Sequence, residues 1–171
     1  VPPHVERLVN EGRIGGVILF AKNVRTPQQV RRLCADLQAL AKSAGLPPLL
    51  ITIDQEGGIV NRLTEGFTVF PGAMAIGASG RSDDAATAGR ITARELKAVG
   101  INTNHAPVLD VNTNPEHPII NIRAFSDDPT LVARLGCAYV RAARAEGVLA
   151  TVKHPAMLIY LDNWMSVRND F

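Results

Sequence analysis

The chain has 171 residues, of which 46% are hydrophobic and 20% charged, a composition typical of a globular domain with a sizeable core. Its 18 basic and 16 acidic side chains leave a net charge of +2, which argues against nucleic acid or an anionic membrane surface as a partner. No apolar run approaches the ~20 residues of a membrane span. Cys34 and Cys137 are far apart and fit neither a disulfide framework nor a metal site.

The first half of the chain predicts strand, helix and strand. Residues 15–20 form a short apolar run bounded by turn residues, which indicates a buried strand. Thr26 then caps a helix that has Pro27 at its first position and Gln29 three residues after the cap. This helix stops at Gly45, and a second buried strand over 49–53 runs directly into Asp54.

The second half repeats this alternation. A helix is expected over 84–99 and a strand over 101–106. Asp128 and Pro129 open another helix, which ends at Gly147, and a strand over 148–152 delivers Lys153 and His154. Strands that are apolar throughout are typical of a parallel sheet covered on both faces by helices. The predicted class is therefore α/β.

The charged residues follow the predicted strands. Asp54, Asp110, Lys153 and His154 all lie at or just beyond strand carboxyl ends, the edge at which parallel α/β folds bind ligands. Two long loops, 54–70 and 110–127, leave from the same edge, whereas the loops of the opposite edge are short. This asymmetry predicts one site-bearing face.

Spacing alone leaves the role of the segment after the second strand open. Asp54, followed by the Gly57-Gly58 pair, suits close approach of the backbone to a ligand, but also a tight turn that Asp54 caps. Arg62 could donate hydrogen bonds to a ligand hydroxyl or carboxylate, or it could be an ordinary surface arginine.

The chemistry of the fourth strand end is also open. Lys153 could be a Schiff-base amine, a donor to sugar hydroxyls, or a partner of Asp54 or Asp110 in a structural network. The set Asp54, Glu56, His105 and Asp110 could bind a metal, but it has no compact ligand spacing, so we expect neither metal nor cofactor. Spacing thus predicts a site and no particular reaction.

Several motifs together resemble family 3 glycoside hydrolases, most closely the bacterial β-N-acetylhexosaminidase branch. They occur in the family's order and spacing. In chain order the motifs are Gly15-Gly16-Val17-Ile18-Leu19-Phe20, Asp54-Gln55-Glu56-Gly57-Gly58 with Arg62-Leu63, Ala106-Pro107-Val108-Leu109-Asp110-Val111, Asn114-Pro115 with Arg123-Ala124-Phe125, and Lys153-His154.

The resemblance implies a (β/α)8 TIM barrel and retaining hydrolysis of terminal β-linked N-acetylglucosamine, without a metal. In many bacteria such enzymes act in peptidoglycan recycling, so the implied partner is an N-acetylglucosamine-containing glycan. By position, Asp54 would accept hydrogen bonds from sugar hydroxyls, and Arg62, Arg123, Lys153 and His154 would complete the binding subsite.

The sequence departs from the family after His154. The family continues with Phe-Pro-Gly-His-Gly and an Asp-Ser-His segment that supplies the acid/base His, whereas residues 155–160 here read Pro-Ala-Met-Leu-Ile-Tyr. The nucleophilic Asp of a later strand also has no counterpart, and Ile59 replaces a common Arg. Because retaining hydrolysis needs both groups, we predict that this chain holds no catalytic residue and is inactive alone.

These departures predict two segments. Residues 1–154 would be the amino-terminal half of a barrel, with its first four or so parallel strands and flanking helices, because a complete barrel takes ~250 residues. Residues 155–171 would be a non-family tail of a truncated or frameshifted product. The alternatives are a non-catalytic sugar-binding module that self-associates through open sheet edges, and an unrelated lyase or aldolase that uses Lys153.

Overall fold

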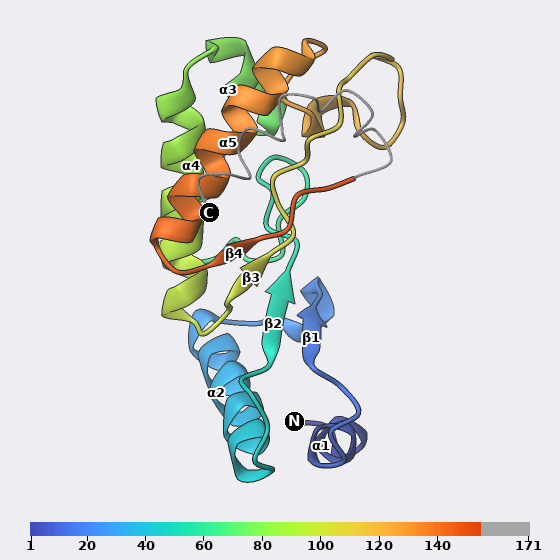
Figure 1. Cartoon of the computed structure of the whole chain (residues 1–171), viewed down its shortest axis with the longest axis vertical. Helices are drawn as coiled ribbons and strands as arrows, with labels where there is room; N and C mark the ends of the chain where they lie inside the picture. Colours follow the sequence, from blue (N-terminus) through green and yellow to red (C-terminus); the bar gives the residue numbers. More distant parts are fainter. Residues whose placement is uncertain (155–171) are drawn as a thin grey trace.

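The computed structural model describes residues 1–154, so the predicted tail over 155–171 lies outside the described residues. One sheet of four parallel strands, paired in chain order, forms the centre (Figure 1). The strands are β1 (Gly16–Leu19), β2 (Leu50–Ile53), β3 (Thr103–Asn104) and β4 (Leu149–Ala150). In the register, Thr52 of β2 lies opposite Thr103, which in turn lies opposite Leu149. The predicted α/β class with parallel strands is confirmed.

One helix precedes the sheet, and the others connect consecutive strands. The helices are α1 (Pro3–Asn10), α2 (Pro27–Ser43), α3 (Ala73–Ser79), α4 (Ser82–Ala98) and α5 (Pro129–Ala145), with the 3-10 turns η1 (Ala21–Asn23) and η2 (Asn121–Arg123). The predicted caps are present, since the Thr26 side chain accepts from the Gln29 N–H and Asp128 accepts from the Thr130 N–H. None of the helices in 1–154 is long and apolar enough to cross a membrane.

Two helices were not predicted, and all four strands are shorter than predicted, most of all β3 and β4, which have two residues each. α1 and α3 have only eight and seven residues, too few for a clear apolar period. At β3 the side chain of Asn102 accepts from the Ile51 N–H and donates to the Leu49 carbonyl, at 2.8 Å each. Side-chain amides thus complete the pairing that an extended strand would otherwise make.

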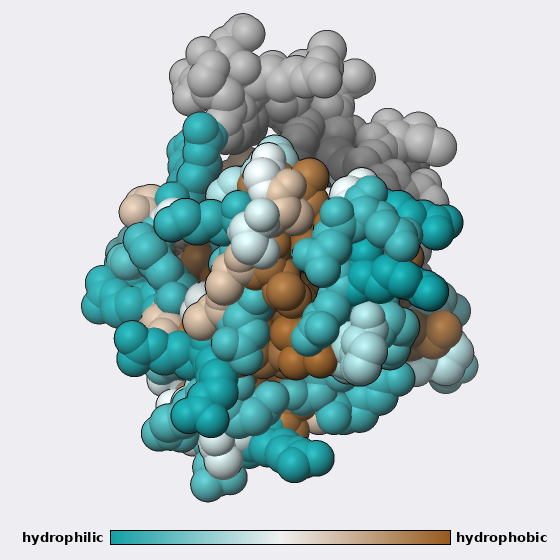
Figure 2. Space-filling model, turned by 90° about the horizontal axis from the view of Figure 1, so that it is seen from below, coloured by the Kyte–Doolittle hydropathy of each residue, from teal (hydrophilic) through white to brown (hydrophobic). Residues whose placement is uncertain are grey.

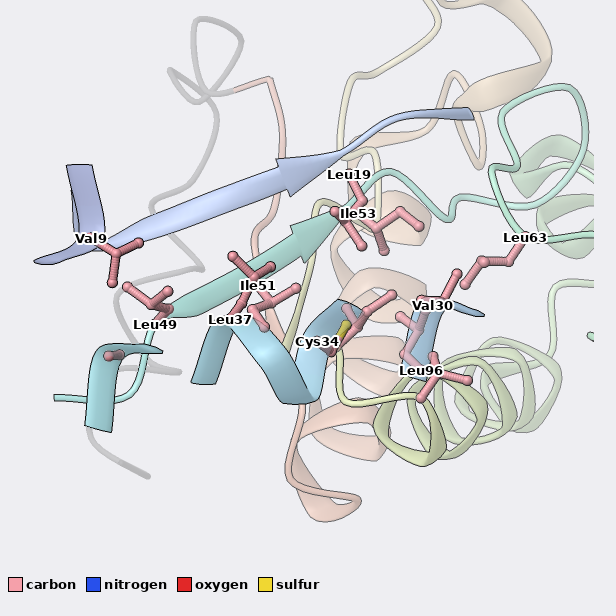
Figure 3. Packing of buried hydrophobic residues seen from close by; sticks show 13 residues of the cluster. Val9, Leu19, Val30, Cys34, Leu37, Leu49, Ile51, Ile53, Leu63 and Leu96 are labelled. Carbon is pink, nitrogen blue, oxygen red and sulfur yellow. The ribbon is translucent and has the colours of Figure 1, made fainter. Parts of the chain in front are cut away.

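One face of the sheet packs on helices. Leu19, Ile51 and Ile53 lie in one buried cluster with Val30, Cys34 and Leu37 of α2 and Leu96 of α4 (Figure 3). Burying apolar area of this kind is the main favourable term in folding. This cluster holds β1 and β2 against the helices and so fixes where their carboxyl ends emerge.

The other face of the sheet is open. Ile18, Leu50 and Leu149 are 41%, 47% and 55% exposed, so the prediction that helices cover both faces was wrong for residues 1–154. Ile18 of β1 and Leu50 of β2 thus place apolar side chains on a face that helices do not cover. Seen from below, the surface also has apolar side chains gathered near its middle and framed by hydrophilic ones (Figure 2).

The second half of the core lies between α4 and α5, which pack closely along their lengths (Figure 1). Ala85 and Ala88 of α4 share a buried cluster with Leu135 and Tyr139 of α5. A Cβ atom on Gly89 would lie 2.5 Å from the Tyr139 carbonyl oxygen, so this crossing requires a residue without a side chain.

Candidate functional site

The loop after β2 is built around one buried glutamine. The Gln55 Oε1 atom accepts from the N–H groups of Arg62 and Leu63, at 2.9 and 3.1 Å, and its Nε2 donates to the Leu63 carbonyl at 2.7 Å. Asn104, at the end of β3, accepts from the Gln55 N–H and donates to the Gln55 carbonyl, at 3.0 and 2.8 Å. These bonds fold the loop back and bring Arg62 beside Asp54.

The turn that follows requires glycine. Gly57 and Gly58 have φ angles of +92° and +57°, a region that L-residues with a side chain rarely adopt. A Cβ atom on Gly58 would also lie 2.7 Å from the Gly72 Cα. The loop is therefore tightly packed against the segment that leads into α3.

Four of the five predicted site residues come together in an ion-pair network. The Lys153 Nζ atom lies 2.7 Å from the Asp54 Oδ1 and 2.6 Å from the Glu56 Oε1, and the Arg62 Nη2 lies 3.5 Å from the Asp54 Oδ2. Arg123 donates from Nε and Nη2 to the two Glu56 oxygens, at 2.8 and 2.9 Å. Residues from the β2 loop, η2 and the chain after β4 thus meet at the carboxyl edge of the sheet.

The fifth predicted residue, His154, pairs with a carboxylate of its own. Its Nδ1 lies 2.7 Å from the Asp110 Oδ2, and its backbone N–H donates to the same oxygen at 3.3 Å. The Asp110 side chain is 8% exposed and that of His154 is 46% exposed. Asp110 also contributes to raising the pKa of Arg123, which places the two pairs in the same electrostatic environment.

Cations stabilise the charged form of Asp54. Burial raises the pKa of Asp54, but the Lys153 hydrogen bond and charge, followed by the charges of Arg62 and His105, outweigh it and lower that pKa. The hydrogen bonds that Arg123 donates to Glu56 raise the pKa of Arg123 against an opposing effect of burial. The cluster thus combines three acidic side chains, Asp54, Glu56 and Asp110, with three basic ones, Arg62, Arg123 and Lys153, and this balance suits a neutral polar ligand.

This geometry decides two of the alternatives left open by spacing. The Asp54 oxygens meet Lys153 and Arg62, so the carboxylate belongs to a shared polar cluster and is more than the cap of its own turn. Two carboxylates against the Lys153 Nζ are the opposite of the desolvated or cation-flanked environment that activates a Schiff-base lysine. The lyase alternative therefore loses its structural basis.

Glu56 is the site residue that we did not predict, except as one candidate for a metal ligand. A sequence signal was available, because residues i and i+2 of an extended segment project to the same side and Glu56 lies two residues after Asp54. Within residues 1–154, no group of three or more His, Cys, Asp or Glu side chains is arranged to hold a metal ion. A hollow of about 320 Å³ adjoins the cluster at Asp110, with Asn112, Asn114 and His117 in its lining.

The comparison with protein families matches this architecture to one model. Residues 3–157 match the glycosyl hydrolase family 3 N terminal domain. This chain belongs to glycoside hydrolase family 3. The family 3 chain is 45% identical over 159 residues to β-hexosaminidase A of Pseudoalteromonas piscicida, covering 90% of this chain and 27% of that protein. It is 38% identical over 149 residues to the β-hexosaminidase of Pseudomonas aeruginosa LESB58, covering 86% and 43%.

Solved structures give the same result. The family 3 β-N-acetylglucosaminidase of Paenibacillus sp. FPU-7 is 48% identical with a TM-score of 0.87, over 90% of this chain and 29% of that one. NagZ of Neisseria gonorrhoeae in complex with N-trifluoroacetyl-D-glucosamine is 34% identical with a TM-score of 0.82, over 90% and 46%. The prediction of a β-hexosaminidase-like family 3 domain with part of a TIM barrel is confirmed, and the chain spans less than half the length of each of these relatives.

Proposed function

We propose that the cluster of Asp54, Arg62, Arg123, Lys153 and His154 binds a terminal β-linked N-acetylglucosamine residue of a peptidoglycan-type glycan. The observation that carries this proposal is the convergence of these side chains at one sheet edge, with Lys153 ion-paired to Asp54 at 2.7 Å. The names of the relatives support the choice of sugar, since they are β-hexosaminidases. The gonococcal relative's structure is described with an N-acylated glucosamine analogue.

The geometry suits an uncharged ring with several hydroxyl groups. The Asp54 carboxylate accepts from sugar hydroxyls, and the Arg62 and Lys153 cations donate to their oxygens, in charge-assisted bonds that are stronger than neutral ones. Because His154 uses Nδ1 on Asp110, Nε2 is the ring nitrogen that meets the sugar. The side chains of Arg62, Arg123 and Lys153 are already partly buried, at 13% to 26% exposed. They therefore lose little further conformational freedom when the sugar binds.

We also propose that this chain by itself binds the sugar without cleaving it. Retaining hydrolysis needs a nucleophile and an acid/base group on one bond, and the sequence after His154 does not match the family segments that supply them. Asp54 is a poor proton donor because its pKa is lowered. Glu56 is 5% exposed and has both oxygens engaged by cations.

Two measurements on the purified chain test these statements. Calorimetric titration with N-acetylglucosamine should show binding that is lost in Asp54→Asn, while 4-methylumbelliferyl N-acetyl-β-D-glucosaminide should not be turned over. Glu116 is exposed on the loop after β3, so the control variant Glu116→Gln should bind N-acetylglucosamine as the unmodified chain does. Absence of binding by the unmodified chain would refute the sugar site, and turnover at the rate of an intact enzyme would refute the lack of catalysis.

A second candidate function is self-association of the half barrel, and the open sheet face favours it. β1 and β4 are the edge strands of the four-stranded sheet, and Ile18, Leu50 and Leu149 expose apolar surface beside those edges. Open edges of this kind pair with other strands. Sedimentation velocity should show a species larger than the 18.3 kDa chain, and Leu50→Lys should reduce it, whereas a monomer at all concentrations would exclude this function.

A further inference from the structure

We propose that Glu56 is a positioning residue, which holds Arg123 and Lys153 in the geometry that binds the sugar without contacting the sugar itself. This inference rests on the proposed sugar site and names how its two long cationic side chains are held. Glu56 comes from the β2 loop, Arg123 from η2 and Lys153 from the chain after β4, so one carboxylate connects three separate segments.

The contacts show a carboxylate whose bonding capacity is taken up by protein cations. Its Oε2 accepts from the Arg123 Nε at 2.8 Å, and its Oε1 accepts from the Arg123 Nη2 at 2.9 Å. The same Oε1 lies 2.6 Å from the Lys153 Nζ. A two-bond fork of this type fixes the plane of a guanidinium as well as its position.

Burial separates Glu56 from its neighbours in the site. Its side chain is 5% exposed, against 17% for Asp54 and 15% for Lys153. A ligand at the cluster surface therefore reaches Asp54, Lys153 and Arg123 before it could reach Glu56. Any effect of Glu56 on sugar binding must pass through the cations that it holds.

The backbone around Glu56 is itself constrained, so the carboxylate is a fixed reference point. Its N–H donates to the Val60 carbonyl at 2.9 Å, and the Gly58 N–H donates to the Phe70 carbonyl at 2.9 Å. The turn between them requires glycine at 57 and 58 because of their positive φ angles and the contact with Gly72. Lys and Arg side chains have large rotamer freedom, and a fixed carboxylate removes it before the ligand arrives.

Replacing this carboxylate with an amide should disturb both cations. In Glu56→Gln, one acceptor oxygen becomes an NH2 group, which faces a donor of Arg123 or Lys153. The cluster also changes from a balance of charges to an excess of one positive charge. Arg123 and Lys153 should then leave their present positions, and the sugar should lose pre-ordered donors.

The experiment compares Glu56→Gln and Glu56→Asp with the full unmodified chain. The matched control is Glu146→Gln, which removes a carboxylate that also faces an arginine, Arg94 at 2.9 Å. Glu146 follows α5 and precedes β4, so it lies at the opposite edge of the sheet from the cluster. The readouts are the dissociation constant for N-acetylglucosamine, the 1H–15N signal of the Arg123 Nε–H group, and the melting temperature.

We expect about tenfold or greater loss of affinity in Glu56→Gln, partial loss in Glu56→Asp, and none in Glu146→Gln. The Arg123 Nε–H signal should be shifted and exchange-protected in the unmodified chain, and should lose both properties in Glu56→Gln. A general loss of stability would lower the melting temperature without selectively altering the Arg123 Nε–H signal. If Glu56→Gln does not fold, Glu56→Asp decides the question in the same assays.

Two results would overturn the inference alone: sugar binding by the Glu56 variants that equals that of the unmodified chain, or an unchanged Arg123 signal despite weakened binding. Failure of the unmodified chain to bind N-acetylglucosamine is a different result, because it overturns the proposed function on which the inference rests. Both failures can therefore be told apart in one set of titrations.

Discussion

Asn104 is the residue on which the site loop depends most directly, and replacing it with alanine should destabilise the protein strongly. Its side chain is 2% exposed and bonds both the N–H and the carbonyl of Gln55, at 3.0 and 2.8 Å. Its Nδ2 also lies 3.3 Å from the Tyr139 hydroxyl. Gln55 stands between Asp54 and Glu56, so the same change should loosen the proposed sugar-binding cluster.

The magnitude follows from the groups left without partners. Asn104→Ala removes the side-chain partners of two main-chain groups of buried Gln55, and a buried polar group without a partner costs roughly 1–3 kcal/mol. The expected loss is therefore about 2–6 kcal/mol, a large part of the roughly 5–15 kcal/mol typical of a domain. With a urea slope of about 2 kcal/mol per molar, the unfolding midpoint should fall by roughly 1–3 M.

Urea unfolding followed by far-ultraviolet circular dichroism measures this loss. Asn61→Ala is the control, because it removes one bond to the Gly58 carbonyl from a half-buried residue and should cost only about 1 kcal/mol. If Asn104→Ala lowers the midpoint no more than Asn61→Ala does, the side-chain amide is not what holds the loop, and the reasoning is wrong.

Three further predictions concern packing, acid stability and thiol reactivity. Gly89→Ala should lower the free energy of unfolding by about 1–3 kcal/mol, because the added Cβ would lie 2.5 Å from the Tyr139 carbonyl oxygen. A Cβ atom on Gly15 meets nothing within 4 Å, so the control Gly15→Ala should leave the melting temperature nearly unchanged. Equal melting temperatures for the two variants would contradict this prediction. The pKa of Asp54 is lowered in the folded state from its ordinary value of 3.8, so its stabilising contribution is complete above that value and is lost as pH falls through the lower folded value. The urea midpoint of Asp54→Asn should therefore depend less on pH below the ordinary value, and an unchanged acid limb would count against the Lys153 pairing. Burial raises the pKa of the Cys34 thiol to about 11, so Cys34 should react with a disulfide reagent at pH 8 only after unfolding, and rapid labelling of Cys34 in the native protein would show that the contact between α2 and the sheet does not bury it.

Local signals explain what could be predicted about the fold. Thr26 with Pro27, and Asp128 with Pro129, mark helix starts through bonds between residues close in sequence, and the apolar runs before Asp54 and Lys153 mark strands. Because parallel strands bring their carboxyl ends to one edge, the meeting of Asp54, Lys153 and His154 at one site followed from the strand order. The short helix α3 and the shortened β3 did not follow, because α3 has no clear apolar period and side chains of Asn102 and Asn104 replace part of the β3 pairing.

Local sequence therefore determined the order of strands and helices, the edge that carries the site, and the family motifs that contain its proposed sugar-binding residues. Only the tertiary structure decided which charges meet: Glu56 pairs with Arg123, 67 residues away, and Asp54 with Lys153, 99 residues away. It also decided that helices cover one face of the sheet and leave Ile18 and Leu50 exposed. The physical reason is that propensities and caps act over a few residues, whereas ion pairs and burial depend on segments brought together by the fold, which no local pattern encodes.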